Sequence, residues 1–249
     1  LFKYVVPKGT QECEKQFSWQ CANKKRLAVY AGYSSDGKIK DSQLYYLNGL
    51  KNVADNIIFV CDCQILPQEI EKIKNIVSVC IFKHHGGYDF GSYKMGYEYA
   101  DKNGLLNGVD EIIFCNDSCY GPVFPFEKCF DSMKDTKCDF WGVVTNCNPK
   151  KRQPEHLQSF FIVIKSNVFN SDAFSRFMCR IKPQRKVKNV IKKYEIPFTN
   201  YLKKYGFSYA VFVPDEKFPY DNINKTFYPL TLIRDCLLYT SDAADEARS

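Results

Sequence analysis

A carboxylate with a polar side chain on either side directly follows an apolar run near the middle of the chain. The three residues are Asn116, Asp117 and Ser118. A carboxylate with neighbouring oxygen atoms at a strand end suits Mg²⁺ or Mn²⁺ that is bound together with a diphosphate. Asp117 is therefore a candidate metal ligand. The alternative is structural, because an Asp-Ser turn that caps the following element would show the same residues.

A second group of polar residues lies in a glycine-rich stretch, Gly86–Gly96, that follows another apolar run. Glycines such as Gly87 let a ligand or a helix terminus approach the backbone closely. Asp89 could accept hydrogen bonds from a sugar or ribose hydroxyl, and Lys94 could pair with a phosphate. The structural alternative is that Asp89 caps a helix and that the glycines allow tight packing.

Two later segments add three further candidates. His156 and Gln158 come just before an apolar run and could hydrogen-bond a sugar or a phosphate, although a lone histidine is more often structural. Glu195 precedes Ile196-Pro197 in a helical region. Proline interrupts a helix, so the Glu195 carboxylate could reach a cleft at that break.

These candidates must be positioned by an α/β fold, since short β-branched or aromatic runs alternate with helical patterns. The expected strands cover residues 26–33, 56–63, 76–82, 111–116, 139–144, 159–165 and 208–213. The expected helices cover residues 41–53, 67–75, 90–102, 124–133 and 187–205. The alternation predicts a mostly parallel sheet covered by helices on both faces. Ligands of such sheets bind beyond the carboxyl ends of the strands.

The composition limits the class of protein. The 249 residues are 45% hydrophobic and 25% charged, which excludes a mostly disordered chain. No apolar run approaches the ~20 residues that span a bilayer. The 12 cysteines include no C-x-x-C pair, and several lie in apolar runs, so we expect reduced thiols in a cytoplasmic protein. The net charge of +7 suits an anionic partner, but no nucleic-acid-binding module is visible.

The two ends of the chain are expected to lie outside the main domain. Residues 236–249 resemble a translated transposon sequencing adapter, so we expect a non-native tail; the alternative is a native amphipathic segment. Without that tail the net charge rises to +9, because it holds one basic and three acidic residues. The chain begins at Leu1, and we expect a fragment in which residues 1–24 are a lead-in or the end of a preceding region. Residues 25–235 would form one truncated domain.

The ordered motifs resemble those of the rhamnan synthesis protein F family. They lie at residues 87–94, 116–122, 139–142, 156–161, 194–195 and 206–207. The resemblance covers roughly residues 26–213 and implies a glycosyltransferase with a GT-A-like, Rossmann-like fold. A more distant similarity to family 2 glycosyltransferases supports the same fold and activity. The Asp-x-Asp motif of that family is reduced here to the single carboxylate Asp117.

The resemblance also implies roles for the candidate residues. Glu195 and Asp117 would be catalytic, Glu195 as the general base on the acceptor hydroxyl if the reaction inverts configuration, and Asp117 as the ligand of Mg²⁺ or Mn²⁺. His156 and Gln158 would bind the acceptor or a phosphate. The donor, a nucleotide-sugar such as dTDP-rhamnose, would contact Tyr33, Asp62, Gly87, Asp89, Lys94, Asn116 and Ser118.

The implied acceptor is a growing lipid-linked or cell-surface polysaccharide. We therefore expect a cytoplasmic enzyme of cell-wall or lipopolysaccharide synthesis, in peripheral contact with the inner face of the cell membrane. The alternative is a non-catalytic carbohydrate-binding or assembly domain that keeps the glycosyltransferase fold. A nucleic-acid partner is not expected.

Overall fold

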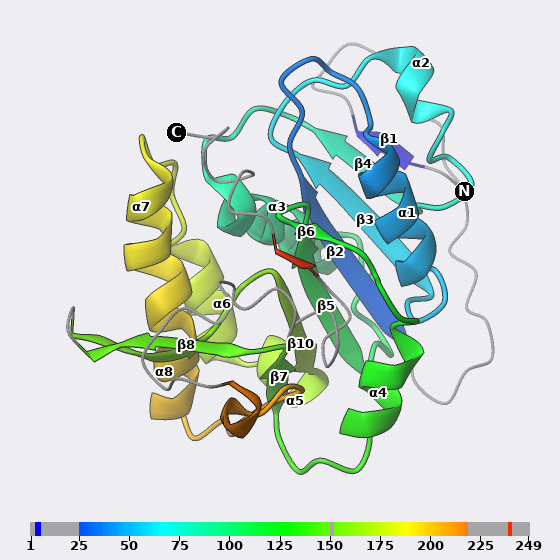
Figure 1. Ribbon diagram of the computed structural model, residues 1–249. Coiled ribbons are helices and arrows are strands. Elements are labelled where there is room, and N and C mark those ends of the chain that lie inside the picture. The colour runs from blue at the N-terminus through cyan, green and yellow to red at the C-terminus, as the bar shows by residue number, and fades with distance from the viewer. Residues whose placement is uncertain (1–2, 6–24, 150–151, 219–238, 241–249) are drawn as a thin grey trace.

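An eight-stranded sheet forms the centre of the computed structural model, which describes residues 3–5, 25–149, 152–218 and 239–240 (Figure 1). The strand order is β1-β4-β3-β2-β5-β10-β7-β11. These strands are β1 (Lys3–Val5), β2 (Arg26–Gly32), β3 (Asn56–Cys61), β4 (Val79–Phe82), β5 (Glu111–Asn116), β7 (Phe140–Gly142), β10 (Phe161–Lys165) and β11 (Tyr209–Val211). Two short pairs lie outside this sheet: β6 (Cys119–Tyr120) with β12 (Tyr239–Thr240), and β8 (Thr145–Asn148) with β9 (Gln153–Leu157).

The first five strands, which we call the parallel half, run in one direction. Within it, the order β4-β3-β2-β5 repeats the third-second-first-fourth arrangement of a Rossmann sheet. Every residue of β3 and β5 is buried, as expected for parallel strands that are covered on both faces. The predicted α/β class with a mostly parallel sheet is confirmed.

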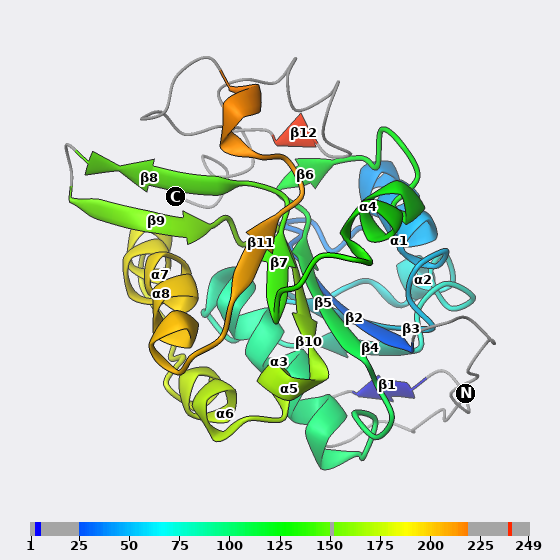
Figure 2. The same cartoon turned by 90° about the horizontal axis from the view of Figure 1, so that it is seen from below.

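Helices cover both faces of the sheet (Figure 2). The successive residues of β2 point to opposite faces, so Tyr30 belongs to one apolar core and Val29 to the other. The core around Tyr30 includes residues of α1 (Asp41–Leu50) and α4 (Glu127–Met133). The core around Val29 includes residues of α3 (Tyr88–Lys102), α5 (Ser166–Phe169), α6 (Asp172–Cys179) and α8 (Ile196–Lys204). The short helix α2 (Pro67–Ile70) follows β3.

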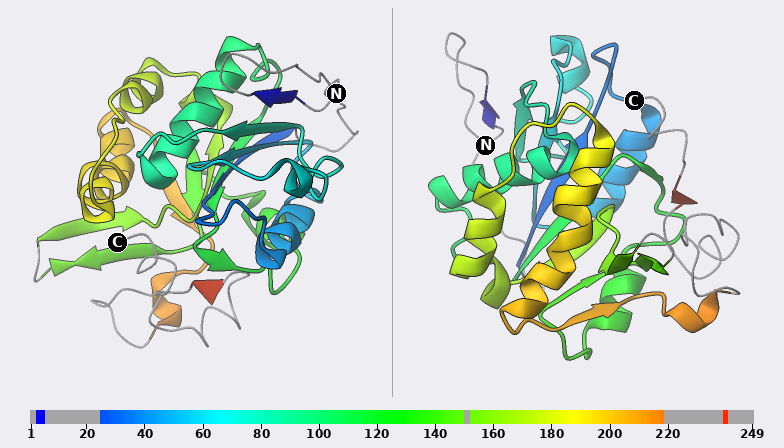
Figure 3. Two further views of the ribbon diagram at one scale, coloured as in Figure 1. Left: turned by 90° about the horizontal axis from the view of Figure 1, so that it is seen from above. Right: turned by 90° about the vertical axis from the view of Figure 1, so that its left-hand side faces the viewer.

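We call the later strands β7 to β11, with helices α5 to α8, the mixed half. Its strand β10 is antiparallel to both neighbours, and Phe161 at its start pairs with Cys115 near the carboxyl end of β5. The residues that precede β10 therefore lie at the edge where the parallel strands end. The hairpin β8–β9 extends away from the sheet beside α8 (Figures 2 and 3), and Leu157 N–H donates to Thr199 Oγ1 at 2.9 Å.

One helical stretch in the mixed half changes its winding. It consists of α7 (Val187–Val190), a π-helical turn at Ile191–Glu195, and α8. Pro197 has no N–H to donate to the carbonyl four residues earlier, which favours a widened turn just before it. The helix predicted over residues 187–205 is present, and the turn that departs from α-helical winding ends at Glu195.

The predicted domain boundaries stay predictions, because most of both end segments lies outside the described residues. Of the lead-in, Lys3–Val5 is described and pairs with β4; of the tail, Tyr239–Thr240 is described and pairs with β6. No helix in the described part of the chain is long and apolar enough to cross a bilayer.

Candidate functional site

A cleft of about 390 Å³ opens at the carboxyl ends of β2, β3 and β4. It lies beside β2, the strand at which the order of the parallel half reverses, and this is the usual ligand position in open α/β sheets. Three of the predicted donor-binding residues line it, namely Tyr33, Asp62 and Asp89.

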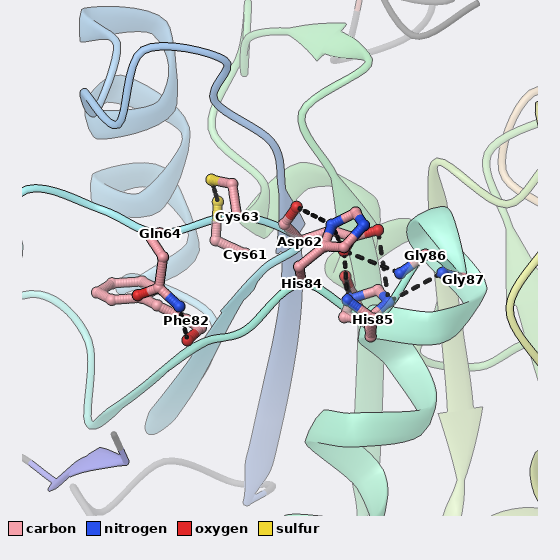
Figure 4. A network of polar contacts seen from close by, with 10 residues as sticks. Cys61, Asp62, Cys63, Gln64, Phe82, His84, His85, Gly86 and Gly87 are labelled. Carbon is pink, nitrogen blue, oxygen red and sulfur yellow. Dashed lines mark hydrogen bonds and ion pairs between the residues drawn. The ribbon is translucent and has the colours of Figure 1, made fainter. Parts of the chain in front are cut away.

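Asp62 follows β3 and holds the glycine-rich loop in place (Figure 4). Its Oδ1 accepts hydrogen bonds from the backbone N–H groups of His85 at 2.6 Å and Gly86 at 3.0 Å. The His84 Nδ1 atom lies 3.1 Å from the same oxygen. The Asp62 carboxylate is therefore bound by the backbone of the loop that follows β4.

The ring of His85 packs under that loop. Gly87 N–H donates to His85 Nδ1 at 3.1 Å, so the neutral ring carries its proton on Nε2, which donates to Ser92 Oγ at 3.0 Å. Burial lowers the pKa of His85, which favours this neutral form. Asp62, His85 and Ser92 are thus adjacent, but His85 presents a donor to Ser92 and cannot activate its hydroxyl as a nucleophile.

His85 was missed as a site residue by sequence reasoning, although a signal was present. A Cβ at Gly91 would lie 2.5 Å from His85 Nδ1, so only glycine lets helix α3 approach the ring. His85 lies in the loop between β4 and α3, and Gly91 lies in the first turn of α3. A histidine in such a loop followed by a glycine in the first turn of the next helix is the pattern that indicates this contact.

The predicted Asn-Asp-Ser group lies directly behind the cleft. Asp117 Oδ2 accepts hydrogen bonds from Tyr33 N–H at 2.8 Å and from Gln43 Nε2 at 3.1 Å. Asn116 Nδ2 donates to Asp89 Oδ2 at 2.9 Å. Ser118 N–H donates to Asn116 Oδ1 at 3.1 Å. The structure therefore brings together five predicted site residues: Tyr33, Asp89, Asn116, Asp117 and Ser118.

These residues do not form a complete site for a divalent ion by themselves. In the described part of the chain, no group of three or more His, Cys, Asp or Glu side chains could hold a metal ion. Asp117 Oδ2 already binds two N–H groups. Magnesium prefers octahedral oxygen coordination, so an ion here would need most of its ligands from a substrate. Metal binding by Asp117 stays a prediction.

Two predicted donor-binding residues point elsewhere. Lys94 Nζ donates to the carbonyl oxygens of Cys179 at 3.3 Å and Ile181 at 3.1 Å, and it lies 3.6 Å from Glu98. It joins α3 to the segment that follows α6. Gly87 uses its N–H on the His85 ring.

Glu195 belongs to a second polar group, at the start of β10. Its Oε2 accepts hydrogen bonds from Ser159 N–H at 3.3 Å and from the Ser159 hydroxyl, and its side chain is 19% exposed. Tyr93 OH donates to the Ser159 carbonyl at 2.8 Å. Burial is the main reason why the pKa of Tyr93 lies well above its usual value. The negative charge of Asp89 raises this pKa further, and Glu195 is among the smaller causes. Tyr93 thus binds the backbone of Ser159, the residue that also donates to Glu195.

His156 and Gln158 lie beside this second group and are buried. The His156 side chain is 0% exposed, its Nδ1–H donates to the Pro154 carbonyl at 2.9 Å, and its Nε2 is 3.9 Å from Glu195 Oε1. Burial lowers the pKa of His156, which favours the neutral ring. Gln158 N–H donates to the Val144 carbonyl at 3.1 Å. In this conformation His156 is covered and touches Glu195 rather than solvent.

Comparison with known proteins identifies one family. The family model described as rhamnan synthesis protein F matches residues 57–239. An uncharacterised protein of Sinorhizobium fredii is 23% identical over 191 residues, which are 76% of this chain and 49% of that protein. The virulence protein VirA of Vibrio anguillarum is 27% identical over 210 residues, which are 83% of this chain and 65% of that protein. The chain thus spans about half to two thirds of these relatives.

Solved structures show weaker likenesses. A 4-diphosphocytidyl-2C-methyl-D-erythritol synthase is 10% identical with a TM-score of 0.48, and the match covers 86% of this chain and all of that one. A glycosyltransferase involved in glycosylation of the major capsid of PBCV-1 is 13% identical with a TM-score of 0.43, covering 89% of this chain and 98% of that one. Likenesses this weak do not identify a function.

Proposed function

The chain belongs to the rhamnan synthesis protein F family, and we propose that it is a glycosyltransferase that moves a sugar from a nucleotide-sugar to a glycan acceptor. The observation that carries this proposal is the cleft at the carboxyl ends of β2, β3 and β4, which is where α/β sheets bind nucleotides. The proposed donor sugar is rhamnose or another deoxyhexose. The proposed acceptor is a lipid-linked or cell-surface polysaccharide, reached by peripheral contact with a membrane.

The cleft offers groups suited to orienting such a donor. Tyr33 supplies an aromatic side chain next to the end of β2, and Asp89 supplies a carboxylate that can accept hydrogen bonds from sugar hydroxyls. Asn116 fixes the Asp89 carboxylate from behind. This arrangement supports a role for Asp89 in donor orientation.

In the proposed reaction, an acceptor hydroxyl displaces the nucleoside diphosphate at the anomeric carbon. The bond between that carbon and the phosphate oxygen breaks, and its electron pair leaves with the diphosphate. Glu195 takes the hydroxyl proton as general base. The two hydrogen bonds from Ser159 hold the Glu195 carboxylate in place. The divalent ion expected at Asp117 stays a prediction, and no step of this reaction depends on it.

A donor screen tests the proposal. A ligand that binds the folded state alone raises its stability by mass action, so a true donor raises the melting temperature in proportion to its concentration over Kd. We expect one nucleotide-sugar to stabilise the protein and to be hydrolysed or transferred. If no nucleotide-sugar stabilises the protein and none is consumed, the proposed function is wrong.

The second candidate is a non-catalytic carbohydrate-binding or assembly domain. The engagement of Asp62 and Asp117 with backbone N–H groups favours it, because Asp62 at the cleft and Asp117 behind it then have a structural role. Glycan binding without any donor consumption would support this candidate over the enzyme.

A further inference from the structure

A segment from the mixed half crosses the cleft of the parallel half. Residues 180–186 connect α6 to α7, and two of them, Gln184 and Arg185, line the cleft. Gln184 N–H donates to the carbonyl of Gly86 at 2.8 Å, which fixes the segment against the glycine-rich loop. Arg185 is therefore placed opposite the ends of β3 and β4, far from its own position in the sequence.

The backbone on the N-terminal side of Arg185 is held firmly. Lys182 N–H donates to Tyr194 OH at 3.0 Å, and Gln184 Nε2 donates to the same oxygen at 3.2 Å. Lys193 Nζ donates to Gln184 Oε1 at 2.8 Å. In contrast, the guanidinium of Arg185 is exposed to the cleft, where the described residues give it neither a hydrogen bond nor an ion pair. A fixed backbone thus presents a positive charge to the cleft.

The other groups expected to bind phosphate are engaged within the protein. Gly86 N–H donates to Asp62 and Gly87 N–H to His85, so these backbone donors are not directed at a ligand. Lys94 donates to two carbonyl oxygens. Arg185 is the one Lys or Arg side chain that lines the cleft within the described residues.

We propose that Arg185 binds the diphosphate of the nucleotide-sugar donor, an inference that rests on the proposed function. The planar guanidinium can donate two parallel hydrogen bonds to phosphate oxygens. The charge of Asp62 on the opposite wall opposes an anion less strongly than a free carboxylate would, because Asp62 Oδ1 accepts hydrogen bonds from two backbone N–H groups. When the bond to the sugar breaks, Arg185 stabilises the negative charge that the departing diphosphate gains. The diphosphate site therefore does not require a divalent ion.

The test measures nucleotide binding by calorimetry on the full chain in the presence of EDTA. The probes are dTDP and UDP, each compared with its monophosphate. We expect the wild-type chain to bind a diphosphate more tightly than the monophosphate. Arg185→Gln should weaken diphosphate binding roughly tenfold, as for loss of a charged hydrogen-bond pair, and should reduce the preference over the monophosphate. Arg185→Lys should keep part of the affinity.

Lys186→Gln is the matched control, since Lys186 is also exposed, is adjacent in the chain and does not line the cleft. If Arg185→Gln leaves diphosphate binding unchanged, this inference is wrong and the proposed function is not affected. The inference is also wrong if EDTA abolishes diphosphate binding and Mg²⁺ or Mn²⁺ restores it equally in the wild type and in Arg185→Gln. If the wild-type chain binds no nucleotide and consumes no nucleotide-sugar, the proposed function fails and the inference fails with it. Melting temperatures of all variants show whether each is folded.

Discussion

In the parallel half, β2, β3 and β4 end at one edge of the sheet, and the residues after their carboxyl ends meet in the cleft. In the mixed half, β10 runs the opposite way, so the residues at that same edge lie before the strand instead of after it. Ser159 lies at this edge because it precedes β10, and Glu195 lies beside it because its carboxylate accepts a hydrogen bond from Ser159 N–H. Searching the residues after each strand therefore finds the site of a parallel sheet and fails where one strand is reversed.

The carboxylates of the two halves also differ in their surroundings. Asp62 and Asp117, at the ends of parallel strands, accept hydrogen bonds from backbone N–H groups of neighbouring loops and hold the cleft together. Glu195 accepts hydrogen bonds from the N–H and the hydroxyl of Ser159, and its side chain is 19% exposed. We infer that the parallel half maintains the shape of the cleft and that the mixed half supplies the reactive groups.

The largest expected effect is on turnover, at Glu195. Glu195→Gln keeps the shape of the side chain but cannot take a proton, so the transfer rate should fall by about 10²–10⁴-fold. Donor affinity should be unchanged, since Glu195 does not line the cleft. Donor calorimetry and transfer rates on one preparation measure both quantities, with Glu98→Gln as an exposed control. Unchanged turnover would remove Glu195 from the mechanism, and lost donor binding would place it in the donor site.

The next effect is on stability, at Asp62. Asp62→Ala leaves the N–H groups of His85 and Gly86 without their acceptor, and we expect a loss of about 2–4 kcal/mol in the free energy of unfolding. Urea denaturation measures it. The exposed Asp101→Ala on α3 is the control and should change stability by less than about 0.5 kcal/mol. Equal losses in both variants would contradict the structural role given to the parallel-half carboxylate.

A smaller effect concerns pH, with one titrating histidine in each half. Burial lowers the pKa of both His85 and His156 from the usual 6.5. Below pH 6.5 the unfolded chain therefore binds protons that the folded chain does not, so stability falls on acidification until the folded pKa is reached. Each group contributes at most about 1.4 kcal/mol per pH unit.

Urea denaturation at about five pH values between pH 7.5 and pH 5 measures how the free energy of unfolding changes with pH. His85→Gln and His156→Gln should each flatten this dependence, while His84→Gln, whose ring is 82% exposed, serves as the control. A slope that neither buried-site variant changes would show that other groups cause the acid sensitivity.

The smallest effect is expected outside both halves. Deleting residues 236–249 should change the free energy of unfolding by less than about 1 kcal/mol, because the described part of this tail is one two-residue pairing with β6. Melting temperature and donor consumption before and after deletion measure it. A large loss in either would show that the tail is a native element.

The sequence predicted the parallel half well for a physical reason. Each of its central strands is a buried apolar run, and the observed strands lie within the predicted ranges. The hairpin β8–β9 was missed because its residues are largely polar and only partly buried. Helix α6 was also missed, although the Ser171 hydroxyl accepts from Phe174 N–H as an N-terminal cap, which is a readable signal.

The candidate site also has a part that the sequence pattern indicates and a part that it does not. Tyr33, Asp62 and Asp89 line one cleft because parallel strands end at a shared edge, and their role in donor binding stays a prediction. Arg185 lies in a basic stretch of the sequence, and a basic stretch does not by itself indicate a position in the cleft. Its position opposite Gly86 depends on the tertiary path of residues 182–186, which no local pattern records.

The π-helical turn at Ile191–Glu195 changes the direction in which the side chains after it face around the helix axis, relative to a regular helix of the same length. Before the turn's end, Tyr194 faces Lys182 and Gln184; after it, Thr199 faces the hairpin β8–β9. A π-helical turn contains one residue more than an α-helical turn, and each α-helical residue rotates the chain by about 100°. Deleting a single residue here would therefore leave a regular helix that can satisfy only one of its two partners. Length, rather than residue identity, is the property that evolution would have to preserve in this turn.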